Sequence, residues 1–177
     1  MIEQPTLSSE RLVLRPFTLS DAEDVQRLAG AEEIADTTLN IPHPYADGLA
    51  EAWIESHADA FRERERLALA ITDSSAVLVG AISLRLELGH GRAELGYWIG
   101  LPYWGRGYAT EAVGVMVGYG FKELGLNRIH AHHLARNPAS GRVLEKAGFT
   151  HEGFHRAHVL KNGRFEDIHS FGFLRAD

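Results

Sequence analysis

Two glycines and a basic residue stand where an apolar run ends and a helical pattern begins, in the segment Pro102-Tyr103-Trp104-Gly105-Arg106-Gly107-Tyr108-Ala109-Thr110. Glycine lets a backbone turn tightly and brings its N–H groups close to a ligand. The first turn of the following helix adds unpaired N–H groups and the positive end of its dipole. A surface helix dipole contributes only about 0.3–1 kcal/mol, so direct amide hydrogen bonds must supply most of the affinity. The segment therefore predicts an anion site, most naturally for phosphate, with Arg106 as a local cation.

The spacing in this loop excludes two common phosphate-binding motifs. A Walker loop requires Gly-x-x-x-x-Gly-Lys-Ser/Thr, and the loop contains no Lys-Ser or Lys-Thr step. A dinucleotide fingerprint needs Gly or Ala at the sixth place of a loop near the first strand, whereas this loop has Thr110 there and comes late in the chain. A plain strand-to-helix turn is the alternative, since a pair of glycines also serves that purpose. The basic residue and the helix start favour phosphate.

A carboxylate just upstream of the loop is the candidate base. Glu94 lies in a predicted strand over residues 92–99, on the face that it shares with Gly96 and Trp98. The alternative is an ordinary surface carboxylate, the commoner fate of a glutamate. At pH 7 about a tenth of an α-amine is neutral, but only about one lysine in a few thousand. A base is therefore helpful for a reaction at the nitrogen of an N-terminus and nearly indispensable for one at a lysine.

Each group of polar residues downstream of the loop has two interpretations, one functional and one structural. Asn137 and Ser140 stand at the start of a predicted helix, where both types are also ordinary capping or first-turn residues. His130 and His132 alternate on one strand face and have the spacing of a metal chelate. The sequence places no acidic third ligand beside them, so we expect sheet packing or the lining of a groove, and no metal.

The surrounding patterns predict one α/β domain across residues 1–177, with a mixed sheet and helices on both faces. A Ser20-x-x-Glu23 capping box is expected to open a short helix that ends at Gly30, and Asp47 to cap a longer helix. An Asn162-Gly163 turn predicts a C-terminal hairpin. The expected strands cover residues 10–17, 67–72, 76–88, 92–99, 127–134, 149–160 and 164–174, and two further helices cover 107–124 and 137–148.

Composition limits the possible partners. The 177 residues are 45% hydrophobic and 24% charged, enough for a core, and the net charge of −6 argues against a nucleic-acid partner. The absence of cysteine excludes disulfides and thiolate sites. Neither a signal peptide nor an apolar stretch of membrane-spanning length is visible, so we expect a cytoplasmic protein without a membrane partner.

The motifs resemble those of the GNAT acetyltransferases. Trp104-x-x-Gly107-x-Ala109 is similar to the coenzyme A pyrophosphate loop Gln/Arg-x-x-Gly-x-Gly/Ala, with tryptophan in the first place. Nearly the whole chain looks like the RimJ/RimL-type branch, through Glu10-Arg11-Leu12-Val13-Leu14-Arg15-Pro16, Ala93-Glu94-Leu95-Gly96-Tyr97-Trp98-Ile99, Asn137-Pro138-Ala139-Ser140 and Leu144-Glu145-Lys146-Ala147-Gly148-Phe149.

The resemblance implies a fold, a co-substrate and roles for named residues. The fold would be a mostly antiparallel sheet of about seven strands. Glu94 would deprotonate the amine, and Ser140 would hydrogen-bond the departing sulfur in place of the tyrosine that many members carry where this chain has Glu145. Main-chain N–H groups near Ile99 would stabilise the oxyanion. Acetyl-CoA would be bound by Ile99, Leu101, Trp104, Gly105, Arg106, Gly107, Tyr108, Ala109, Thr110, Asn137 and Ser140.

These features predict an acetyl-CoA-dependent N-acetyltransferase that modifies a protein N-terminal α-amine by direct attack in a ternary complex. A small-molecule amine, such as a polyamine or an aminoglycoside, is the alternative acceptor. Residues 37–45 and the C-terminal hairpin are expected to build the acceptor groove. A non-catalytic coenzyme A-binding module is the other alternative, motivated by the missing tyrosine at Glu145. Family analogy also implies a homodimer.

Overall fold

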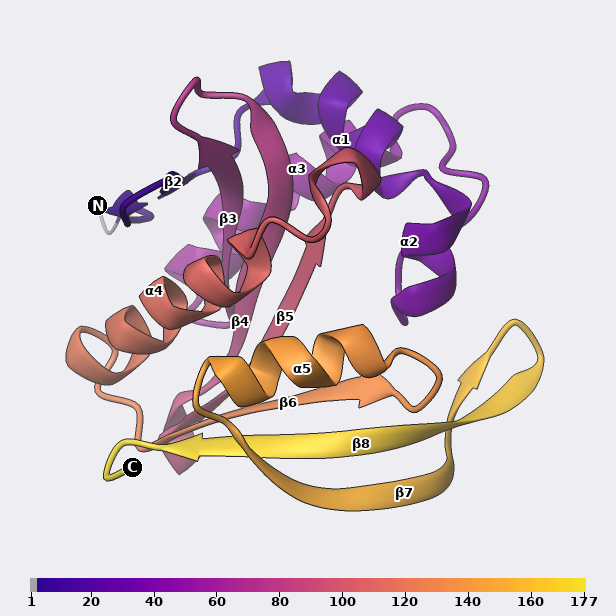
Figure 1. The fold of residues 1–177 in the computed structure, drawn as a ribbon. Helices are drawn as coiled ribbons and strands as arrows, with labels where there is room; N and C mark the ends of the chain where they lie inside the picture. The colour runs from indigo at the N-terminus through magenta and orange to yellow at the C-terminus, as the bar shows by residue number, and fades with distance from the viewer. Residues whose placement is uncertain (1–2) are drawn as a thin grey trace.

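The computed structural model describes residues 3–177, which fold around one eight-stranded sheet (Figure 1). The strand order is β1-β2-β3-β4-β5-β6-β8-β7, and each neighbouring pair is antiparallel except β5 and β6. The predicted mixed, mostly antiparallel sheet is therefore confirmed, with one more strand than expected. The strands are β1 (Leu7–Ser8), β2 (Leu12–Arg15), β3 (Arg66–Asp73), β4 (Leu78–Glu87), β5 (Arg92–Ile99), β6 (Arg128–Leu134), β7 (Thr150–Lys161) and β8 (Arg164–Leu174).

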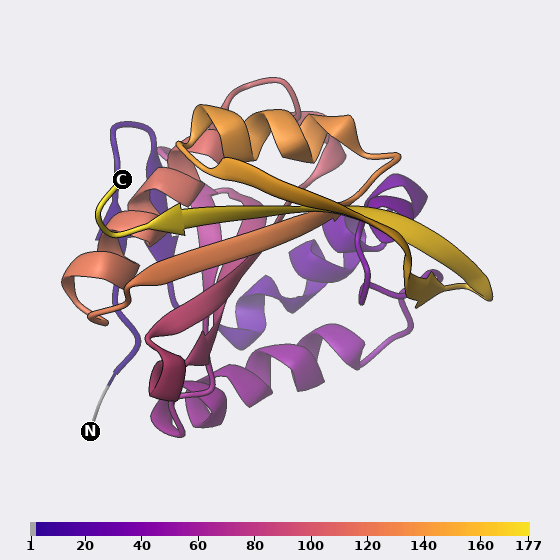
Figure 2. The ribbon, with the colours of Figure 1, turned by 90° about the horizontal axis from the view of Figure 1, so that it is seen from below.

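Helices cover both faces of the sheet, as Figures 1 and 2 show. On one face lie α1 (Ala22–Ala29) and α3 (Leu49–Arg62), with α2 (Glu32–Thr37) beside them. On the other lie α4 (Tyr108–Lys122) and α5 (Pro138–Lys146). Short 3-10 turns, η1 (Leu19–Asp21), η2 (Leu88–His90) and η3 (Leu101–Tyr103), complete the elements.

The alternation of side chains along β5 separates these two faces. Trp98 packs in the apolar cluster that contains residues of α1 and α3, whereas Leu95 packs in the cluster that contains residues of α4 and α5. We call the side that bears Glu94, Gly96 and Trp98 the α1/α3 face, and the side that bears Leu95 and Tyr97 the α4/α5 face. The predicted division of β5 is thereby confirmed.

The parallel pair β5–β6 opens into a fork. The two strands are in register at Arg92–Arg128, Ala93–Ile129 and Glu94–His130. Beyond this point they diverge, although β5 continues to Ile99 and β6 to Leu134 (Figure 1). Main-chain groups on the facing edges of the two strands beyond Glu94 and His130 are therefore free of the β5–β6 ladder.

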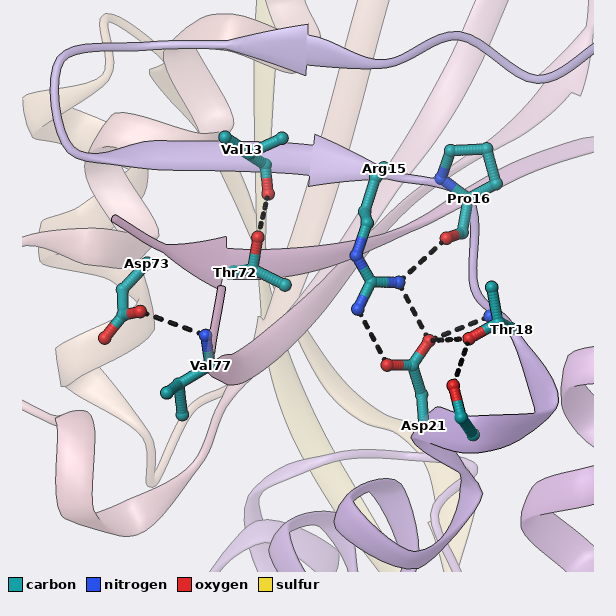
Figure 3. A network of polar contacts seen from close by, with 9 residues as sticks. Val13, Arg15, Pro16, Thr18, Asp21, Thr72, Asp73 and Val77 are labelled. Carbon is teal, nitrogen blue, oxygen red and sulfur yellow. Dashed lines mark hydrogen bonds and ion pairs between the residues drawn. The ribbon is translucent and has the colours of Figure 1, made fainter. Parts of the chain in front are cut away.

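The cap of the 3-10 turn η1, which leads directly into α1, differs from the sequence prediction (Figure 3). The capping box joins Thr18 and Asp21 rather than Ser20 and Glu23. The buried Asp21 carboxylate accepts hydrogen bonds from Arg15 Nη1 at 2.8 Å, from Arg15 Nη2 at 2.7 Å and from the Thr18 N–H at 2.8 Å. Arg15 favours this cap over Ser20 and Glu23, because the Asp21 carboxylate that pairs with it also accepts the Thr18 N–H.

The cap of α3 was also predicted wrongly. Gly48, with φ of 82°, occupies the N-cap position instead of Asp47, whose carboxylate accepts a hydrogen bond from Gln26 Nε2 at 2.8 Å. Strand β1 and helix α2 were not predicted. Within residues 3–177, no helix combines the length and apolar character needed to cross a membrane.

Candidate active site

The glycine loop lies between the end of β5 and the start of α4. Gly105 and Gly107 have φ of 74° and 79°, backbone conformations that residues with a Cβ rarely adopt. Gly107 is the N-cap of α4, so Tyr108, Ala109 and Thr110 form the first turn of the helix, where main-chain N–H groups have no intrahelical partner. The exposed Trp104 donates its indole N–H to the Ile99 carbonyl oxygen at 2.6 Å and so ties the loop to the strand.

A second arginine, which the sequence did not single out, supports this loop. Arg11 donates from Nη1 to the main-chain oxygen of Arg106 at 3.0 Å and stacks over the Tyr108 ring at 5.1 Å. Its Nε also donates to Glu111 Oε2, in the first turn of α4, at 2.7 Å. Arg106 itself reaches back to the Pro102 carbonyl oxygen at 3.2 Å. The loop thus has two cations beside it, and one of them is held by a carboxylate.

The main chain at Ile99 faces the fork. Gly100 donates its N–H to the Val79 carbonyl oxygen on β4, at 2.8 Å. Because main-chain groups alternate direction in an antiparallel ladder, the N–H of Ile99 points to the opposite edge of β5, where β6 has diverged. This is a suitable position for an oxyanion donor.

A neutral polar pair lies on the α4/α5 face. The Tyr97 hydroxyl is 2.8 Å from Ser140 Oγ and 3.2 Å from the Ser140 main-chain oxygen. Burial raises the pKa of Tyr97 to about 12, and the hydrogen bond with Ser140 offsets only part of this increase. Ser140 lies in the first turn of α5, with Asn137 at its N-cap. The pair therefore remains protonated throughout the neutral range.

A charged group lies on the α1/α3 face, where Glu94 contacts two basic side chains. His132 Nδ1 on β6 is 3.0 Å from Glu94 Oε1, and Arg85 on β4 pairs with Oε2. Contact with the His132 imidazole outweighs the effect of burial and, together with the Arg85 charge, lowers the pKa of Glu94 to about 2. Glu94 is therefore ionised at any physiological pH.

These side chains line a pocket of about 400 Å³. Arg128 and Glu152 form a second ion pair in its wall, and the C-terminal hairpin of β7 and β8 contributes further residues. Both carboxylates in the wall are therefore already paired with arginine. The polar residues lining the pocket are Arg85, Glu94, Arg128, His130, His132, Glu152, His155, His158 and Ser170.

The structure thus divides the predicted site residues between two faces. Ser140 contacts Tyr97 on the α4/α5 face, while Glu94 lies on the α1/α3 face at the base of the fork. Leu101 starts the turn η3 that links β5 to the loop. Sequence reasoning missed Arg11, Arg85 and Tyr97, and it did not pair His132 with Glu94. Only the alternation along β5 hinted at Tyr97, because no local pattern reveals contacts between distant strands.

Residues 11–150 match the acetyltransferase (GNAT) domain family. The chain belongs to this family. The GNAT resemblance inferred from its motifs is confirmed, and the chain is an N-acetyltransferase.

Comparison with individual GNAT proteins supports the same assignment. An uncharacterised N-acetyltransferase, p20 of Bacillus licheniformis, is 32% identical over 175 residues, which cover 97% of each chain. The spermidine N(1)-acetyltransferase of Vibrio cholerae is 25% identical over 169 residues, covering 95% of each chain.

The fold also matches a solved structure of the RimJ/RimL-type branch. RimL, a ribosomal L7/L12 alpha-N-protein acetyltransferase in complex with coenzyme A, superposes with a TM-score of 0.88 at 16% identity, covering 96% of this chain and 98% of RimL. At this identity the likeness shows the fold, and the predicted GNAT-type fold is thereby confirmed.

Proposed function

We propose that this acetyltransferase moves the acetyl group of acetyl-CoA to a primary α-amine, such as a protein N-terminus, by direct attack in a ternary complex. The observation that carries the proposal is the fork, which has a loop of free amides at its open end and a polar pair on each of its faces. A thioester lying in the fork would expose its carbonyl carbon to an amine arriving from the α1/α3 face.

The α4/α5 face is assigned to the co-substrate. The main-chain amides from Gly105 to Thr110 would grip the diphosphate, and Arg106 would supply positive charge. Asn137 would contact the pantetheine arm, and the Ser140 hydroxyl would hydrogen-bond the departing sulfur. Leu101 and Trp104 would line the entrance. The N–H of Ile99 would stabilise the oxyanion of the tetrahedral intermediate.

The acceptor belongs on the α1/α3 face, where the negative charge of Glu94 would attract a cationic amine. The pocket there favours an acceptor with a single positive charge, because its two carboxylates are paired with Arg85 and Arg128. A polyamine needs several unpaired carboxylates. The α-amine of a protein fits this pocket better.

A small-molecule amine is the second candidate, since the spermidine acetyltransferase of Vibrio cholerae is similar along 95% of its length. The two classes are separated by recording thiol release from acetyl-CoA with three probes at equal concentration: a peptide with a free α-amine, the same peptide with its α-amine blocked and one lysine, and spermidine. We expect the free α-amine to give the highest kcat/KM. A higher value for spermidine would overturn the acceptor assignment, and no release with any amine would overturn the reaction itself.

A further inference from the structure

The arrangement around Glu94 bears on which atom takes the proton from the acceptor amine. The carboxylate is held on two sides, by Arg85 from β4 and by His132 from β6. Both contacts favour its ionised form. The contacts with His132 and Arg85 hold the pKa of this carboxyl well below that of an α-amine, so direct proton transfer to it is unfavourable. A second group is needed between the amine and Glu94.

His132 has the position that this second group requires. The β5–β6 register ends at Glu94–His130, so His132 is the first residue of β6 beyond the fork on the α1/α3 face. About a third of its side chain, 32%, is exposed, and it lines the pocket. On the β5 side, Gly96 presents no side chain to this face, and a Cβ added there would meet only Ser83 Oγ at 3.5 Å. The space for an amine is the pocket that His132 lines, and Gly96 adds no side chain to this face.

The tautomer follows from the contact with Glu94. Nδ1 lies 3.0 Å from a carboxylate, which accepts a proton and has none to give, so the neutral ring carries its hydrogen on Nδ1. Nε2, on the far side of the ring, is then left with a lone pair. This is the arrangement in which a carboxylate orients an imidazole as a base and stabilises the imidazolium that forms.

We propose that His132 Nε2 is the proton acceptor of the reaction, with Glu94 as its positioning residue. The inference rests on the proposed acetyl transfer. The amine nitrogen forms a bond to the thioester carbonyl carbon, and its proton passes to His132 Nε2. Collapse of the tetrahedral intermediate breaks the C–S bond, whose electron pair leaves with sulfur. The thiolate takes up a proton from solvent, and the imidazolium later returns its proton to solvent.

Other charged groups face the same pocket and influence this imidazole. Arg85 approaches from β4, Arg128 and His130 share β6 with it, and Glu152, His155 and His158 approach from β7. Both arginines are paired with carboxylates. Of these charged groups, Glu94 is the one that contacts the His132 ring. Removing that carboxylate therefore removes the group that fixes the orientation and tautomer of the ring.

The test compares the pH dependence of kcat/KM for four proteins: wild type, His132→Gln, Glu94→Gln and His90→Gln. His90 is an exposed histidine in the turn before β5 and serves as the matched control. The acceptor is whichever amine of the three-probe panel turns over fastest. Calorimetry with coenzyme A, run on each variant, shows that the protein is folded and still binds its co-substrate.

In the wild type, the free amine and the imidazole must both be unprotonated, so log kcat/KM should rise with a slope of about two on the acid side of the profile. His132→Gln should lower kcat/KM about 100-fold and reduce this slope to about one. Glu94→Gln should keep the steeper slope but lower kcat/KM about 10-fold, because the ring loses the carboxylate that orients it. His90→Gln should match the wild type.

The inference is overturned if His132→Gln keeps a slope of about two, or if Glu94→Gln abolishes turnover while His132→Gln remains within about twofold of the wild type. Either result would leave the acetyl transfer intact. If the wild type releases no thiol with any probe, the proposed function itself fails. The two failures are therefore distinguishable.

Discussion

The two faces of the sheet at β5 carry polar pairs of opposite electrical character. On the α1/α3 face, Glu94 is ionised and contacts His132 and Arg85. On the α4/α5 face, Tyr97 and Ser140 are neutral and joined by a hydrogen bond. Glu94 and Tyr97, from which the two pairs start, are only three residues apart on β5. A single strand can therefore present a charged, proton-accepting environment and a neutral, hydrogen-bonding one, because successive side chains point to opposite faces.

The difference suits the two ends of an acyl transfer. The attacking amine loses a proton, which requires a basic group whose charge can change. The departing sulfur gains negative charge, which a neutral hydroxyl can stabilise without titrating. We expect variants on the α1/α3 face to alter pH dependence, and variants on the α4/α5 face to alter rate at a constant pH profile.

Two buried histidines, one on each face of the sheet, differ in whether their ring nitrogens are hydrogen-bonded. This difference gives the largest expected effect on stability. His57 in α3 is 2% exposed, packs against Trp53 at 4.4 Å, and has no hydrogen-bond partner for either ring nitrogen among the described residues. His133, which faces α5, is also buried but donates from Nδ1 to the Leu134 carbonyl oxygen at 2.8 Å. Burial lowers the pKa of His57 from 6.5 to about 4, so the unfolded chain binds a proton in this range that the folded protein does not.

The free energy of unfolding should therefore fall as pH drops from about 6.5 towards 4, by about 2 kcal/mol between pH 7 and pH 5. Urea unfolding of the wild type and of His57→Leu at both pH values measures this. The variant should lose most of the pH dependence, whereas His133→Leu should lose less of it. An unchanged difference between the two pH values in His57→Leu would contradict the assignment.

Local features of the fold and of the loop were accessible from sequence. The bounds of β5 and β8 were predicted correctly, because alternation and turn residues depend on neighbouring positions. Asn162 and Gly163 adopt φ of 48° and 76°, in agreement with the predicted turn. Gly105 and Gly107 adopt the conformations for which glycine is suited. In each case the decisive interactions lie within a few residues.

Contacts between distant segments could not be read in this way. Arg11 donates its main-chain N–H to Glu111 Oε1, a residue 100 positions away, and no spacing rule connects them. The pairing of His132 with Glu94 depends on which strands become neighbours and in what register. The cap ahead of α1, at η1, was misassigned for the same reason, since Arg15 reaches Asp21 from the preceding strand. Long-range pairing, rather than local preference, decides these polar partners.

Ser140→Ala tests the co-substrate side of the comparison. Loss of a hydrogen bond to a developing thiolate should lower kcat about 10-fold, equivalent to about 1.4 kcal/mol. The slope of log kcat/KM against pH should not change, in contrast to His132→Gln. Ser56→Ala, an exposed serine of α3, is the control. If Ser140→Ala instead flattens the pH profile, then proton transfer is not confined to the α1/α3 face.

Tyr97→Phe should have the smallest effect, about threefold on kcat, because it removes the partner of Ser140 and not the hydroxyl that meets the sulfur. When Tyr97 donates to Ser140 Oγ, the proton of the serine remains available to the sulfur, and the phenol fixes its direction. Tyr119→Phe, a partly buried tyrosine of α4, is the matched control and should leave kcat unchanged. The double variant of Tyr97→Phe and Ser140→Ala decides the point: since Tyr97 acts through Ser140, it should be no slower than Ser140→Ala alone. Multiplying effects would instead mean that the phenol contacts the reacting groups directly, and the α4/α5 face would then hold two independent donors.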